Sequence, residues 1–324
     1  MLLNALRRVA QLNDSVLSAV EHGPDVGRAD NDDADASEVE ARIIEGEPRS
    51  LRAFPVTAAE SSGFSAFLDG IQRARVKLNI GPVPIVYGYG AAVIRARSDR
   101  RMGTHPLGLL DEREALFLPF RLVAPAELEP FGLTRDQMVD TSPPDFEPLP
   151  LFPPTLYARA GQAVDRWRES IERAVASRWV AASSEEWLLA HGTLTFSPEL
   201  SACPRAVGLI SSHRTRFFDG DDARTLLSLQ AGERTSVFEP LTRRWTPVHS
   251  WYLRLRDPGG HDVLWGLVRV EVSASEDTPR IADLVSGWLL AERAPLALPN
   301  GRWDRLLYAL NDCEQFLRAR APGV

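Results

Sequence analysis

The predicted order of strands rests on residues 67–97, which read FLDGIQRARVKLNIGPVPIVYGYGAAVIRAR. A short apolar run leads into Asp69 and a glycine, so we expect a strand that ends at this carboxylate. Over residues 76–80 apolar and polar side chains alternate, which is the period of a half-buried strand. The Gly-Pro pair at 81–82 is a turn signal, and residues 83–97 indicate one or two further strands. The stretch therefore predicts an antiparallel meander of three strands with Asp69 on the first.

Helices and strands alternate along the rest of the chain. Apolar side chains recur every three or four residues over 156–175, which predicts a long amphipathic helix. Further strands are expected at residues 187–190, 206–210, 251–255 and 264–272, and further helices at residues 280–293 and 302–320. This order is typical of an α/β protein with a mixed sheet flanked by helices.

Three segments fall outside this pattern. Apolar residues at helical spacing predict an N-terminal helix over residues 1–26, which either packs on its own domain or contacts a partner. Residues 27–58 are acidic and polar, and they predict a solvated connector. Six prolines between Pro143 and Pro154 exclude regular helix or central strand there and predict an inserted loop or linker. One folded domain is then expected over residues 59–324.

Composition narrows the class of protein. With 324 residues, 44% of them hydrophobic, the chain is long enough for one large domain. Its net charge of -7 argues against a surface that is basic throughout, but it leaves room for a local basic groove. The two cysteines, Cys203 and Cys313, form neither a CxxC pair nor a zinc site, and they fit a reducing compartment. No apolar run approaches the roughly 18–20 residues that span a bilayer, so we expect a cytoplasmic protein without membrane contact.

Five stretches resemble, in order, motifs of the NurA family of DNA nucleases. They are FLDG at 67–70, the long helix before His191, LLAHGTL at 188–194, VGLISSHR at 207–214, and the pair WYLRL at 251–255 with VRVEV at 268–272. The sequence departs from the family at His191, where the family has aspartate, and at Ser211, near which it usually has lysine. The resemblance spans roughly residues 60–320.

Members of that family have an RNase H-like core, degrade DNA ends with manganese and work with HerA, a hexameric DNA-translocating ATPase. The resemblance therefore implies an RNase H-like mixed sheet, Mn2+ or Mg2+ as cofactor, DNA and a HerA-like ATPase as partners, and a homodimer. Signatures of other enzymes are missing from the sequence, which has no GxxxxGK[ST], GxSxG or HExxH motif.

The resemblance also implies a catalytic and metal-binding set made of Asp69, Glu172 and His191. Phosphodiester hydrolysis of this kind uses two divalent ions held by clustered carboxylates, so Asp69 and Glu172 should lie within about 8 Å of each other on one side of the sheet. Each residue also has a structural interpretation: a turn aspartate, a solvated glutamate paired with Arg168, and a strand-end histidine.

Contacts to DNA phosphates are expected from Ser211, His213, Arg214 and Arg254, because such contacts need donors and positive charge. The alternative is that the arginines only solubilise the surface. A neutral imidazole at position 191 and a hydroxyl at position 211 leave two functions open within the family. One is a metal-dependent nuclease, and the other is a silent adaptor that keeps the fold and gates the ATPase. A globular protein unrelated to nucleic acid is a third possibility.

Overall fold

A long β-hairpin forms the centre of the structure, which is a computed structural model. Strand β5 (Phe64–Ile80) pairs antiparallel with β6 (Val83–Ser98), and β6 pairs antiparallel with β8 (Leu110–Leu118). Gly81 in the connecting turn has a φ of 52°, a left-handed conformation that costs glycine little. The antiparallel pairing and the place of Asp69 on the first strand are confirmed. Residues 67–97 nevertheless form two strands instead of three, because residues 64–80 are one continuous strand, and the third strand of the meander, β8, lies beyond them. The structure describes residues 2, 6, 17–20, 26, 37–46, 50–129, 132–182, 185–242, 247–293, 305 and 307–323.

Asp69 lies inside β5, so the expectation that it ends a strand is wrong. Partly exposed and buried residues alternate from Arg73 to Ile80. The strand continues past Asp69 because β6 pairs with it from Ala66 to Ile80, with an irregularity at Lys77. The glycine at position 70 interrupts the apolar pattern without interrupting the strand.

The hairpin belongs to a 14-stranded mixed sheet, which confirms the predicted α/β class with a mixed sheet flanked by helices. Strand β10 (Trp187–His191) runs parallel to β5, and β11 (Ala206–Ile210) runs parallel to β10. Beyond β11 the sheet continues with four strands, each antiparallel to the one before it: β16 (Leu267–Ser273), β15 (Val248–Arg254), β14 (Phe238–Pro240) and β3 (Ala41–Ile43). At the other end of the sheet, β9 (Met138–Asp140) lies next to β8. The short strand β7 (Arg101–Thr104) pairs with β6.

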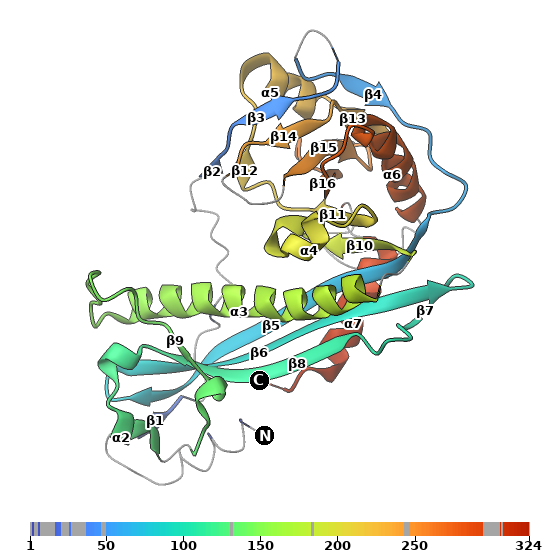
Figure 1. The fold of residues 1–324 in the computed structure, drawn as a ribbon. Helices are drawn as coiled ribbons and strands as arrows, with labels where there is room; N and C mark the ends of the chain where they lie inside the picture. The colour runs from blue at the N-terminus through green and yellow to red at the C-terminus, as the bar shows by residue number, and fades with distance from the viewer. Residues whose placement is uncertain are drawn as a thin grey trace.

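Helices cover both faces of this sheet (Figure 1). Helix α3 (Pro153–Ala181) lies along one face of the meander, where its buried residues pack against Leu68. Helix α7 (Tyr308–Arg320) packs on the opposite face, against Phe67. Helix α6 (Thr278–Glu292) contacts β15, and the shorter helices are α2 (Pro125–Leu128), α4 (Pro198–Ser201) and α5 (Gly220–Leu227). Burial of apolar side chains on both faces supplies most of the driving force for this arrangement.

The predicted N-terminal helix is wrong in part. Strand β1 (Leu17–Ala19) pairs antiparallel with the end of β5, because unpaired backbone groups at a strand edge outweigh a local helical preference. Leu2 and Leu6 are helical and buried, and the other residues of 1–16 lie outside the described residues.

The prediction of a solvated connector over residues 27–58 is wrong for residues 37–46 and 50–58, while residues 27–36 and 47–49 lie outside the described residues. Three strands form here. Strand β2 (Ser37–Glu38) pairs with β12 (Thr215–Arg216), β3 pairs with β14, and β4 (Ala53–Pro55) pairs with β13 (Glu233–Thr235). An acidic segment thus becomes an edge of the folded domain.

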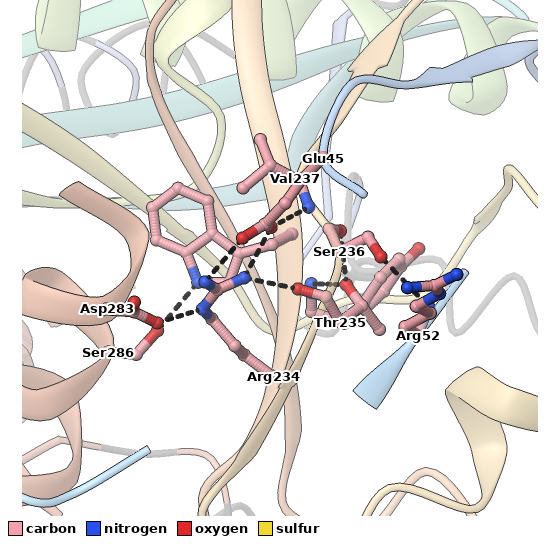
Figure 2. Close-up of polar contacts among 10 residues, drawn as sticks. Glu45, Arg52, Arg234, Thr235, Ser236, Val237, Asp283 and Ser286 are labelled. Atoms are coloured by element: carbon pink, nitrogen blue, oxygen red, sulfur yellow. Dashed lines mark hydrogen bonds and ion pairs between the residues drawn. The ribbon is translucent and has the colours of Figure 1, made fainter. Parts of the chain in front are cut away.

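Residues 37–46 fold onto the sheet and supply Glu45, a partner of the buried Arg234 (Figure 2). Arg234 is 2% exposed, and its guanidinium donates to both oxygens of Glu45 at 2.7 and 2.9 Å and to Asp283 of α6 at 2.7 Å. Glu45 also accepts a bond from the backbone N–H of Val237. A buried cation needs such partners, and one of them comes from the segment that was expected to be solvated.

The proline-rich segment is an ordered loop, as expected. Residues 141–152 form no helix or strand. The Arg121 guanidinium donates to the carbonyl oxygens of Pro143, Pro144 and Glu147, which holds the loop against the rest of the domain. Among the helices that the structure describes, none has the length and hydropathy needed to cross a membrane.

Candidate active site

Asp69 and His191 lie side by side on neighbouring parallel strands. Strand β10 pairs with β5 as far as Ala190, opposite Leu68, so the next residue on each strand brings the two side chains together. The His191 Nδ1 atom is 3.1 Å from Asp69 Oδ1. Asp69 is 6% exposed and also accepts a bond from the Gly70 N–H. The carboxylate thus orients the imidazole and is itself largely withdrawn from water.

Ser211 completes a chain of polar contacts. It directly follows β11, which is parallel to β10, and its Oγ atom is 3.4 Å from His191 Nε2. The two departures from the NurA motifs, His191 and Ser211, therefore contact each other. The Arg305 guanidinium donates to the Ser211 carbonyl oxygen at 2.9 Å, so a cation lies beside the position where lysine was expected.

Glu172 approaches the same point from α3. A Cβ atom added to Gly70 would lie 2.1 Å from Glu172 Oε1, so only glycine leaves room for this carboxylate against the β5 backbone. Glu172 is 5% exposed and forms an ion pair with Arg168, one turn earlier on the helix. Burial raises the pKa of Glu172 to about 7; the Arg168 charge opposes this rise and the Asp69 charge adds to it.

The two carboxylates nevertheless approach from opposite faces of the sheet. Asp69 shares its face of β5 with Phe67, which packs in the cluster that contains α7, whereas Gly70 and Glu172 lie on the α3 face with Leu68. The expectation that both carboxylates project from one side is therefore wrong. The reason is that the family-like DG pair lies inside a continuous strand, where successive residues must alternate.

The residues expected to contact phosphate separate into two kinds. Arg254 is fully buried, and its guanidinium donates to four carbonyl oxygens, those of Leu227, Leu229, Val263 and Trp265. His213 is partly buried, its Nε2 lies 3.0 Å from the Leu267 carbonyl oxygen, and it stacks on Tyr252. Burial lowers the pKa of His213 to about 4. The prediction of a phosphate contact is wrong for Arg254, which is fully buried and bonded to carbonyl groups. For His213 and for Arg214, which is exposed, it stays a prediction.

Glu271 and Arg269, two residues apart on β16, form a largely buried ion pair. Glu271 is 2% exposed and accepts bonds from Arg269, from the Thr193 hydroxyl at 2.6 Å and from the Leu194 N–H at 2.9 Å. Sequence reasoning missed Thr193, although it directly follows the His-Gly pair that ends β10. The Glu271 contacts fix the loop that leaves β10.

No family model and no curated protein matches this chain. Within the described parts of the chain, no group of three or more His, Cys, Asp or Glu side chains is arranged to hold a metal ion.

Proposed function

We propose that the chain is a NurA-type, RNase H-like protein that handles DNA ends together with a HerA-like hexameric ATPase, and that it acts as a catalytically silent adaptor. The strand order β8-β6-β5-β10-β11 supports the fold. An antiparallel meander, a long helix and two parallel strands are the order expected of an RNase H-like core. The ordered sequence motifs support the partners, including DNA and a second copy of the chain.

The adaptor is favoured over the nuclease by the contacts of the two candidate metal-binding carboxylates. Both candidate metal-binding carboxylates are already bonded within the protein, and they approach from opposite faces of β5. Asp69 is bonded to His191, an imidazole at the position where the NurA motif has a carboxylate, and Glu172 is paired with Arg168. A pair of divalent ions about 3.5–4 Å apart requires carboxylates that surround one space. The residues present do not provide that space, so they do not fit a two-metal centre.

The experiment is cleavage of a linear DNA duplex in Mn2+ or Mg2+, with and without a HerA-type ATPase. The unmodified protein, His191→Asp and His191→Ala should all stay at background, because restoring one oxygen ligand changes neither the Glu172 contacts nor Ser211. In the same reactions the protein should co-purify with the ATPase and change its DNA-dependent rate of ATP hydrolysis. Failure to bind the ATPase in any nucleotide state would remove the adaptor proposal.

A metal-dependent nuclease is the second candidate, and the contact at Gly70 favours it. Glu172 lies against the Gly70 backbone, and the charge of Asp69 contributes to its raised pKa. A single divalent ion bound near these two charges would therefore be stabilising, even though the carboxylates do not surround a space for two ions. In that case cleavage requires Mn2+ or Mg2+ and is lost in Asp69→Asn. Asp136→Asn removes an equivalent charge from an exposed site and serves as the control. Metal-dependent cleavage that Asp69→Asn abolishes and Asp136→Asn preserves would replace the adaptor by the nuclease.

A further inference from the structure

A cavity of about 450 Å³ opens beside the candidate site, at the carboxyl ends of β10 and β11. Gly192 and Ser212 line it, and they directly follow His191 and Ser211. The loops that leave the carboxyl ends of parallel strands are where ligands of α/β proteins commonly bind. Two residues that line this cavity are thus the immediate chain neighbours of His191 and Ser211.

The N-terminal segment forms one wall of the cavity. Ser37 and Val39 line it, and their backbone N–H groups donate to the carbonyl oxygens of Arg214 and Arg216. The cavity thus exists because residues 37–46 fold onto the sheet. Its volume lies in the range of pockets that enclose small ligands, about 300–1,000 Å³.

We propose that this cavity receives the terminal nucleotide of a DNA strand, with its phosphate at Arg214. This assignment rests on the proposed role in handling DNA ends and names the part of the DNA that the protein holds. The lining supplies each kind of group that a nucleotide needs. Hydroxyls of Thr195 and Ser212 can bond base edges or sugar, and Phe217 offers an aromatic wall on which a base can stack.

Among the described residues that line the cavity, Arg214 is an exposed arginine. The neighbouring Arg216 is paired with Glu38 and Asp219, whereas the Arg214 side chain has no acceptor among the described residues and is exposed. A guanidinium in that state can form charge-assisted bonds with two phosphate oxygens.

The floor of the cavity is electrically balanced and rigid. Arg269 pairs with Glu271, and its guanidinium lies 5.0 Å from the centroid of the Phe217 ring. Because these two charges cancel and Glu271 is held by the Thr193 hydroxyl, the floor neither attracts nor repels an anion strongly. The phosphate is therefore expected at the rim and the neutral base deeper inside.

The test is binding of a 12-nucleotide single strand with a 5′-phosphate and an internal dye, followed by fluorescence anisotropy in EDTA. Arg214→Ala should weaken binding about tenfold, because a hydrogen bond to a charged group contributes roughly 1.5–3 kcal/mol. Arg101→Ala is the matched control, since Arg101 is an exposed arginine on β7, a strand that contributes no residue to the lining of the cavity. It should change the affinity less than twofold.

Two further arms separate a terminal pocket from a general phosphate groove. A circular single strand of the same sequence has no end, so Arg214→Ala and Arg101→Ala should bind it equally. Thymidine monophosphate should compete with the linear strand, and thymidine should compete about tenfold less well. Ser212→Tyr, a change at an exposed position that fills the cavity, should also weaken binding of the linear strand alone.

Equal affinity of Arg214→Ala and Arg101→Ala for the linear strand would overturn the proposal. The same loss on linear and circular strands would do so as well, because it would indicate a groove that reads phosphates along the strand. If circular dichroism shows that Ser212→Tyr does not fold, the comparison of Arg214→Ala with Arg101→Ala still tests the proposal. Binding is measured without metal or ATPase, so this result and the test of the adaptor can fail independently.

Discussion

Replacing Gly70 by alanine should disrupt the meeting point of β5 and α3. The added Cβ would lie 2.1 Å from Glu172 Oε1 and 2.8 Å from both Cδ and Cγ of the same side chain. These separations are far inside van der Waals contact, so the glutamate must move. It is 5% exposed and paired with Arg168, and moving it either breaks that pair or strains the packing of α3.

The expected cost is about 1–3 kcal/mol, the usual penalty for adding a methyl group to a packed interior. Backbone strain adds nothing to it, because Gly70 is not among the glycines with positive φ. With a denaturant slope of about 1–3 kcal/mol per molar urea, the unfolding midpoint should fall by roughly 1 M.

The assay is urea unfolding followed by circular dichroism. Gly103→Ala in β7 is the control, since a Cβ there meets nothing within 4 Å and its midpoint should stay unchanged. Adding Glu172→Ala to Gly70→Ala should recover part of the loss, because the clash disappears with the carboxylate. Equal midpoints for Gly70→Ala and Gly103→Ala, or strictly additive effects in the double variant, would refute this account of the contact.

Three further predictions concern residues that hold the fold. Burial lowers the pKa of His213 from its usual 6.5 to about 4 in the folded protein, so the unfolded chain binds more protons between these values. Stability present above pH 6.5 is therefore lost as the pH falls toward 4. His213→Phe should remove about 2 kcal/mol of the difference between pH 7 and pH 5 in urea unfolding; an unchanged pH profile would contradict this. Arg234→Ala should cost about 3–5 kcal/mol in the same assay, since Glu45 would keep a largely buried charge without its main partner, and a loss under 1 kcal/mol would argue against the cluster. Arg254→Ala should lower the free energy of unfolding by at least about 3 kcal/mol, because four carbonyl oxygens lose their donor. The same change should leave the salt dependence of DNA binding unchanged. A shallower salt slope in the variant would show that Arg254 contacts phosphate.

The sequence alone was sufficient for the elements whose signals are local. Alternation and the Gly-Pro turn predicted the hairpin of β5 and β6, and the apolar stripe predicted α3. The strand at residues 206–210 was predicted with the same bounds as β11. These features depend on side-chain periodicity and turn chemistry, which neighbouring residues determine.

Only the tertiary structure decided which side chains meet. Arg254 looked like a surface cation in the sequence, but its strand lies inside the sheet and its charge is enclosed by carbonyl groups. Glu45 looked like part of a solvated connector, but its partner Arg234 is 189 residues away. The DG pair at Asp69 suggested a strand end, but β6 pairs with β5 on both sides of Asp69, from Ala66 to Ile80. In each case the partner lies outside the local stretch of sequence. Whether a charge is buried, or a strand continues, depends on contacts with that partner, which the local pattern of residues does not reveal.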